Sequence, residues 1–288
     1  MRDISPYFFL LPALIYLIVI SIYPLIFSLT LSFHKWDLVA AEKNWVFLGL
    51  DNYINIVTKD SEFWTSLFIT LKFVFFAVSI EFLLGLGFAL LLNREIRMKR
   101  IIVTLMIIPM MLTPVVVGIM WRNIYNPRYG LVAHFLYLFG FTQEVPWLGD
   151  VNLAFISVLI TEVWQWSPFF MLTLLAGLQS MPKEPYEAAM VDGASKIKIF
   201  IHITLPLLMP IIITTILIRV IDVIKLFDVV WIMTKGGPGF STTTSTIYIY
   251  LQAFKYWFMG YSSALSYTLL LITAITIAIL LRILRRYR

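Results

Sequence analysis

The sequence contains no cysteine, which excludes a disulfide framework and a thiolate metal site. It has three histidines, too far apart in the chain to predict a ligand cluster: His34, His134 and His202. No segment matches Gly-x-x-x-x-Gly-Lys-Ser/Thr, the loop with which many proteins bind nucleotide phosphates. Charge is also scarce, because Asp, Glu, Lys and Arg make up 13% of the residues against about 25% in soluble domains. We therefore expect a chain without catalytic groups, metal or cofactor of its own.

The sequence is instead rich in apolar residues, at 60% with a mean hydropathy of +0.89. A soluble domain of this size could not bury so much apolar surface, so lipid is the expected solvent. Six stretches approach or exceed the ~20 residues that a membrane-spanning helix needs: 8–31, 68–92, 101–124, 153–178, 207–233 and 264–284. The first is too long for the apolar core of a signal peptide and is expected to be retained. The sequence predicts one all-α membrane domain over residues 1–288, with six transmembrane helices.

The basic residues predict the orientation of these helices. If the amino terminus is cytoplasmic, twelve basic residues lie inside, namely Arg2, Arg94, Arg97, Lys99, Arg100, Lys183, Lys196, Lys198, Arg282, Arg285, Arg286 and Arg288. Seven then lie outside, in longer loops, namely Lys35, Lys43, Lys59, Arg122, Arg128, Lys235 and Lys255. The positive-inside rule therefore places both termini in the cytoplasm. Membrane topology also accounts for the +6 net charge, and nucleic acid is not an expected partner.

One predicted cytoplasmic loop, residues 180–206, has the features of a short docking helix. Pro185 suits the first turn of a helix, and Gly193 suits the left-handed position that ends one. Tyr186, Ala189 and Met190 fall on one face by their spacing. The segment is typical of a helix that docks into a groove of a cytoplasmic partner, although an ordinary interfacial helix would have the same features.

The same loop resembles the signature of permease subunits of binding-protein-dependent ABC importers. The resemblance rests on Glu187-Ala188-Ala189, Gly193, Ile203 and Leu205-Pro206, with each spacing met. It implies the six-helix type I ABC importer permease fold and a coupling helix that contacts an ATPase subunit. The residues it assigns to coupling are Tyr186, Glu187, Ala188, Ala189, Met190, Asp192 and Gly193. The implied partners are a second homologous permease, two ATPase subunits that bind ATP and Mg²⁺, an extracytoplasmic binding protein and the bilayer of a bacterial or archaeal cytoplasmic membrane.

Other stretches are similar to the first permease subunit of carbohydrate importers. They are 47–53, Phe227-Asp228, 234–238, 242–244 and 260–265. The resemblance implies ATP-driven uptake of a disaccharide, an oligosaccharide or a compound such as glycerol 3-phosphate.

Polar residues inside the predicted helices mark a candidate substrate pathway. A charge at the centre of a spanning helix costs about 2.5–3.5 kcal/mol, so it usually faces a cavity or a partner. The residues expected to line the pathway are Glu162, Gln165, Trp166, Arg219 and Asp222. An ion-pair network that only joins helices, such as Arg219 with Asp222 or Glu162, is the alternative. Lys72, Glu81, Lys225 and Asp228 are expected to be structural.

An ion-coupled secondary transporter is the competing functional class. It would show inverted repeats and broken helices around an ion site, and the sequence shows neither clearly. A membrane-embedded enzyme would need converging catalytic groups that the sequence does not offer.

Overall fold

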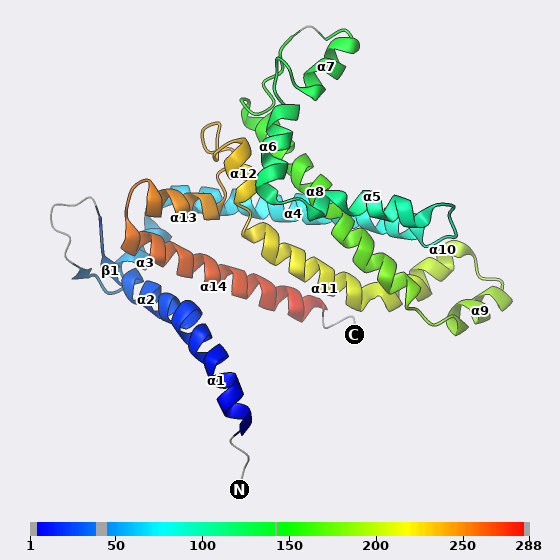
Figure 1. Ribbon diagram of the computed structural model, residues 1–288, viewed down its shortest axis with the longest axis horizontal. Coiled ribbons are helices and arrows are strands. Elements are labelled where there is room, and N and C mark those ends of the chain that lie inside the picture. The colour runs from blue at the N-terminus through cyan, green and yellow to red at the C-terminus, as the bar shows by residue number, and fades with distance from the viewer. Residues whose placement is uncertain (1–4, 39–44, 142, 285–288) are drawn as a thin grey trace. The chain divides into compact units, whose positions relative to one another are not determined.

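The computed structural model describes residues 5–38, 45–141 and 143–284, which are predominantly helical (Figure 1). Arg2, Lys43, Arg285, Arg286 and Arg288, which enter the charge comparison above, lie outside the described residues. The elements in chain order are α1 (Ser5–Leu17), the π-helix η1 (Ile18–Ile22), α2 (Tyr23–Ser32), β1 (His34–Lys35), β2 (Val46–Phe47), α3 (Asp51–Thr58), α4 (Ser61–Leu92), α5 (Lys99–Met111), α6 (Pro114–Ile124), α7 (Leu131–Leu138), α8 (Val151–Gln179), α9 (Glu184–Val191), α10 (Lys196–Ile199), the π-helix η2 (Phe200–Thr204), α11 (Leu205–Ile224), α12 (Asp228–Met233), α13 (Ser245–Phe254) and α14 (Met259–Leu284).

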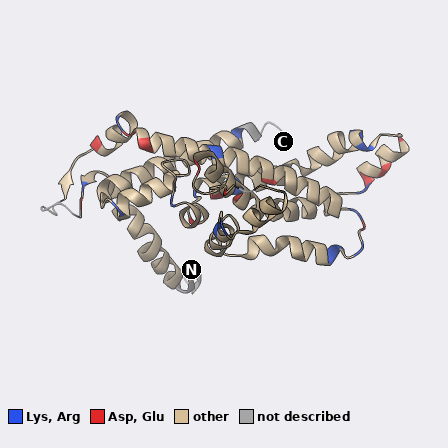
Figure 2. Cartoon of the chain, turned by 90° about the horizontal axis from the view of Figure 1, so that it is seen from above, with Lys and Arg blue, Asp and Glu red and all other residues tan. Residues whose placement is uncertain are grey.

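Five helical segments are long and apolar enough to cross a membrane, and a bent pair brings the number to as many as six in the described chain. Each of the six predicted stretches coincides with one of them to within two residues or lies inside it. In Figure 2 charged residues are sparse along the long helices and more frequent at their ends and in the connections. The apolar window of α8 is 67% buried, so α8 is a core helix, and that of the first span is 0% buried. The all-α fold with its apolar spans is thus as predicted, while the cytoplasmic position of both termini stays a prediction.

The third and fifth spans are not continuous, which the sequence prediction missed. The predicted helix 101–124 is two helices, α5 and α6, bent by 96° between Met111 and Pro114. The predicted helix 207–233 is interrupted after Ile224 and resumes at Asp228. Proline explains the first break, because its ring disfavours helical backbone in the preceding residue and Thr113 is extended. The sequence did not show these breaks clearly, and the structure has one in each of the two spans.

Two compact units divide the chain, one of Met1–Trp64 with Tyr248–Ala274 and the other of Thr65–Ile247 with Ile275–Arg288. That residues 1–288 fold together as a single membrane domain stays a prediction. In the first unit, Asp60 precedes α4 and accepts a hydrogen bond from Phe63 N at 2.8 Å. Its carboxylate also accepts from the hydroxyl groups of Tyr248 and Tyr261. Burial raises the pKa of Tyr248 above its usual range, so this hydroxyl group stays protonated and donates to Asp60.

The predicted motif 47–53 also belongs to the first unit, where it fixes the short β1–β2 hairpin. Asn52 is buried at the start of α3, and its side-chain amide donates to Ser32 O at 2.8 Å and His34 O at 3.2 Å. The two strands pair antiparallel, with His34 opposite Phe47. A single buried amide therefore joins the end of α2, the hairpin and α3.

In the second unit α8 packs against α5 and α11 (Figure 1). A β-carbon at Gly85 would lie 2.3 Å from Phe170 Cβ, so the close approach of α4 and α8 requires glycine there. The elements α9 and α10, in the loop predicted to be cytoplasmic, lie at the opposite end of α8 and α11 from α12 (Figure 1). The second unit thus contains every residue predicted for the coupling loop and for the pathway.

The break between α11 and α12 is stabilised by Thr244, from the motif 242–244 singled out in the sequence, and by Thr246, which lies outside that motif. Leu226 O, inside the break, accepts hydrogen bonds from Thr244 Oγ1 at 2.9 Å and from Thr246 Oγ1 at 2.8 Å. A buried carbonyl without a partner is costly, so these hydroxyl groups replace the helical hydrogen bond that the break removes.

Candidate functional site

A buried charged cluster of Glu81, Glu162 and Arg219 joins the three long helices α4, α8 and α11. Arg219 Nε donates to Glu81 Oε2 at 2.9 Å, and Arg219 Nη2 lies 3.0 Å from Glu81 Oε1 and 2.8 Å from Glu162 Oε1. The exposed fractions of the three side chains are 0–3%. Because guanidinium offers a planar fork of donors, one arginine can hold two carboxylates on different helices. The fork therefore compensates the cost of placing these charges away from water.

Trp166 completes this cluster, one helical turn beyond Glu162 on α8. The guanidinium carbon of Arg219 lies 4.6 Å from the centre of the Trp166 ring, in cation–π geometry. Of the predicted pathway residues, Glu162, Trp166 and Arg219 thus meet in one place. Glu81, expected to be structural, belongs to the same group. A single sequence could not reveal this pairing, because Glu81 and Arg219 are 138 residues apart.

A pocket of about 270 Å³ opens beside the cluster, where the two broken spans come together. Its lining residues come from the start of α6, from α8, from the end of α11, from the break that follows and from the start of α12: Pro114, Glu162, Trp166, Arg219, Asp222, Lys225, Leu226, Phe227, Asp228 and Val229. At its rim Asp222 pairs with Lys225 at 3.2 Å, with both side chains partly exposed. The alternative ion pair between Arg219 and Glu162 is present, whereas Asp222 pairs with Lys225 and not with Arg219.

Gln165 differs from the other predicted pathway residues, because it does not line the pocket. It is fully buried, and its side-chain nitrogen donates to Leu112 O at 3.1 Å, in the α5–α6 break. The amide thus supplies a hydrogen bond to a carbonyl that the break leaves without a helical donor. Lys72, expected to be structural, is exposed on α4 and lies 4.8 Å from the centre of the Phe68 ring.

The predicted docking helix is present as α9, with the start and end that its sequence indicated. Pro185 occupies its first turn, and Gly193 follows it with φ +71°, a backbone conformation that glycine adopts without strain. Gly193 N donates to Met190 O at 3.1 Å and Ala194 N donates to Ala189 O at 2.9 Å. This pair of bonds is the Schellman motif that ends many helices.

The exposed surface of α9 combines acidic and apolar side chains. Glu187, Ala188, Asp192 and Gly193 are exposed. Met190, Val191 and Ile197 are exposed by 63%, 88% and 73%, so most of the surface of each of these apolar side chains is uncovered. The predicted common face is divided, because the Tyr186 hydroxyl lies 3.2 Å from Thr204 Oγ1 and faces its own chain, with Ala189 half-buried. Met190 and Val191 therefore form the apolar part of the exposed surface of α9, and Ile197 is an exposed apolar residue on the neighbouring α10.

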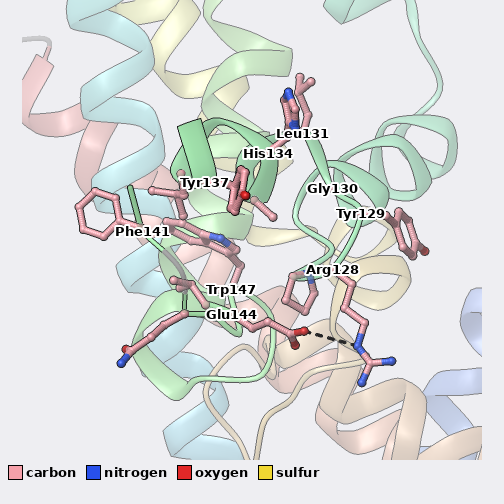
Figure 3. A pocket seen from close by; sticks show the side chains of 14 residues that line it. Arg128, Tyr129, Gly130, Leu131, His134, Tyr137, Phe141, Glu144 and Trp147 are labelled. Carbon is pink, nitrogen blue, oxygen red and sulfur yellow. Dashed lines mark ion pairs between the residues drawn. The ribbon is translucent and has the colours of Figure 1, made fainter. Parts of the chain in front are cut away.

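A larger hollow of about 770 Å³ lies around α7, and its lining includes the aromatic residues Tyr129, Tyr137, Phe141 and Trp147 (Figure 3). Arg128 and Glu144 approach to 3.7 Å across it, and both side chains are largely exposed. Ion pairs so open to water contribute about 0–1 kcal/mol, so they do not fix the hollow in one shape. The pocket at the helix breaks has the buried, converging polar groups that ligand sites share, and the hollow around α7 does not.

Known proteins that resemble this chain are membrane subunits of transporters. Residues 81–288 match the family described as binding-protein-dependent transport system inner membrane component. A probable ABC transporter permease protein, y4oQ, of Sinorhizobium fredii is 40% identical over 90% of this chain and 83% of its own length. The trehalose/maltose transport system permease protein MalF of Thermococcus litoralis is 39% identical over 88% of this chain and 83% of its own. The trehalose transport system permease protein SugA of Mycobacterium tuberculosis is 34% identical over 88% and 80%.

The fold agrees with these matches. A chain in the crystal structure of a bacterial ABC transporter for import of the acidic polysaccharide alginate has a TM-score of 0.84, covering 99% of this chain and 96% of its own at 21% identity. Identity at that level supports the fold alone. Together with the family match and the curated relatives, it leads to one conclusion: this chain belongs to the family of binding-protein-dependent transport system inner membrane components, the permease subunits of ABC importers.

Proposed function

We propose that this chain forms, with a second homologous permease, the pathway of an ATP-driven carbohydrate importer in a bacterial or archaeal cytoplasmic membrane. Two ATPase subunits would bind and hydrolyse ATP with Mg²⁺, and an extracytoplasmic binding protein would deliver the sugar. The chain itself has a transport role and no catalytic one. The observation that carries the proposal is α9, a short helix with a defined start and end that exposes acidic and apolar side chains. It lies in the chain between α8 and α11, two of the helices that the buried cluster joins.

The physical route from ATP to transport runs through α9 into the second unit. The helix lies between α8 and α11, since α8 ends five residues before it and α11 follows α10 and η2. Tyr186 connects it to Thr204, in η2 at the start of the fifth span. A partner that moves α9 would therefore move α8 and α11, which carry the cluster and the pocket. Work is done only if that partner binds two states of the permease with different affinity.

The pocket beside Trp166 is the proposed share of this chain in the substrate pathway. Hydroxyl-rich ligands suit carboxylate and amide acceptors, and an aromatic ring suits the C–H surface of a sugar. A carbohydrate is also the cargo named for two of the relatives, the trehalose/maltose and trehalose permeases. At about 270 Å³ the pocket is small, and the second permease would supply the facing wall.

Broken helices around a polar pocket also occur in ion-coupled secondary transporters. Dependence on an ATPase separates the two classes. The test is to reconstitute this chain with a candidate second permease, ATPase and binding protein, and to measure ATPase activity with loaded binding protein. Glu187→Lys should reduce the stimulated activity at least about tenfold and weaken co-purification of the ATPase.

Glu184→Lys is the matched control, since it reverses the same charge in the first turn of the same helix but outside the signature. The control should keep most of the stimulated activity. Transport without any ATPase, or equal loss in the two variants, would contradict the coupling role of α9.

A further inference from the structure

The loop that connects α4 and α5 is strongly basic and exposed. Residues 94–100 contain four cations and one carboxylate, namely Arg94, Arg97, Lys99 and Arg100 against Glu95. The three arginines are exposed, and Lys99 is half-buried. The ion pairs found among the described residues all involve other side chains. The positive charge of this loop is therefore available to a partner outside the chain.

These cations do not serve the stability of α5. Lys99 and Arg100 lie in its first turn, where the positive end of the helix dipole disfavours a cation and favours acidic residues. Met98, which precedes them, has φ +62°, a conformation that is uncommon for a residue with a side chain. Without a partner the charges weaken the start of α5, and an anionic partner would remove that repulsion.

The loop lies at the membrane boundary. Residues 93–98 connect two helices that belong to apolar spans, so each cation is within a few residues of a span. Ile96 and Met98 lie between the cations and are exposed by 39% and 66%. Long basic side chains at such a position extend toward the headgroups while their aliphatic parts stay near the hydrocarbon. Cations mixed with exposed apolar side chains fit a lipid, whose headgroup meets the first and whose acyl chains meet the second.

The docking loop at the same end of the spans has a different charge pattern (Figure 1). It carries three lysines and three carboxylates, namely Lys183, Lys196, Lys198, Glu184, Glu187 and Asp192. Its carboxylates would repel an anionic headgroup, whereas mixed charge suits a protein surface that also presents both signs. The α4–α5 loop offers mainly cations, so its complement is a surface of negative sign. A bilayer with anionic lipids is such a surface.

We propose that the α4–α5 loop binds the headgroup of an anionic phospholipid. Its four cations attract the negative headgroup, and Ile96 and Met98 contact the first part of the acyl chains. Guanidinium groups suit the lipid phosphate because each can donate two hydrogen bonds to it at once. The interaction concerns the surrounding bilayer, and it is independent of the cargo and of the partner that binds α9.

The test uses the absence of cysteine from the chain. Asn93→Cys places a single thiol at an exposed position beside the loop, where a fluorophore reports on the nearest lipids. The labelled full chain is reconstituted in phosphatidylcholine vesicles, and quenching by brominated phosphatidylglycerol is compared with quenching by brominated phosphatidylcholine. Phosphatidylglycerol should be preferred about fivefold or more, since each cation near an anionic lipid surface contributes up to about fivefold.

Two substitutions of the arginines separate charge from shape. Arg94→Gln with Arg97→Gln and Arg100→Gln should reduce the preference for phosphatidylglycerol to about twofold or less. Replacing the same three arginines by lysine keeps the charge and should keep most of the preference. Thermal unfolding in neutral detergent should be unchanged in both variants, because these side chains are exposed.

The matched control removes three cations from the docking loop. Lys183→Gln with Lys196→Gln and Lys198→Gln should leave the preference unchanged. Equal quenching by the two lipids, or equal loss in the two glutamine variants, would overturn the proposal. Inorganic phosphate at matched ionic strength should have no effect, and if it abolishes the preference the loop binds free anions instead of lipid. An arginine variant that keeps the lipid preference but no longer co-purifies with an ATPase would identify the loop as a protein contact, and the proposal would fail.

Discussion

The buried cluster and helix α9 treat charge in opposite ways. In the cluster Arg219 pairs with two carboxylates on two other helices, and all three side chains are almost completely buried. On α9 the acidic residue Glu187 is exposed beside outward-facing Met190 and Val191. The first region obtains most of its partners within its own chain, whereas the second presents groups that a partner would cover. We infer from this difference that the cluster holds the helices of the permease together, whereas α9 is exposed for contact with a partner that would move it.

The largest expected effect comes from removing the centre of the buried cluster. Arg219→Ala leaves Glu81 and Glu162 as uncompensated carboxylates and should destabilise the folded protein by about 3–5 kcal/mol. Thermal unfolding in detergent, followed by size-exclusion chromatography with fluorescence detection, measures the loss.

A neutral version of the cluster is the control for this experiment. Arg219→Met combined with Glu81→Gln and Glu162→Gln removes all three charges at once and should recover most of the stability, because buried ion pairs often do little better than neutral side chains. If the triple variant is no more stable than the single one, the cluster does more than balance its own charges.

The sequence predicted α9 well because its limits depend on local chemistry. Pro185 and Gly193 set the two ends with no help from distant residues. The cluster could be predicted only in part, since the pairing of Glu81 with Arg219 depends on which helices lie side by side. The breaks were not clear in the sequence because the apolar runs continue through them, so that Leu112 and Leu226 look like residues of a spanning helix. Their carbonyl groups accept hydrogen bonds from Gln165 and Thr244, which lie on other segments, and only the structure shows these donors.

A smaller and more local effect is expected at the end of α9. Gly193→Val places a β-branched residue at φ +71° and should destabilise this backbone conformation by about 1–2 kcal/mol. The effect should be confined to the end of α9 and should leave the core unchanged. Stimulated ATPase activity of the reconstituted importer should fall while the unfolding temperature of the permease stays within a few degrees.

Gly193→Asn is the matched substitution, because asparagine tolerates the left-handed region better than other residues with a side chain. It should retain more of the coupled activity than Gly193→Val. Equal loss in the two variants would point to a contact of the glycine itself with the partner, and not to its backbone conformation.

The smallest effect of a single substitution is expected at the break between α11 and α12, where hydrogen bonds from the same chain stabilise the interrupted helix. Thr246→Val removes one of two hydroxyl groups that donate to Leu226 O, so the carbonyl keeps Thr244 and the loss should stay near or below about 1 kcal/mol. Thr244→Val with Thr246→Val leaves the carbonyl without either donor and should cost more than the sum of the single changes, up to about 3 kcal/mol. Thermal unfolding of the three variants measures this difference. Strict additivity of the two losses would mean that water or a backbone movement replaces the missing donors to Leu226 O. The break would then depend less on hydrogen bonds within the chain than the comparison with the exposed helix α9 suggests.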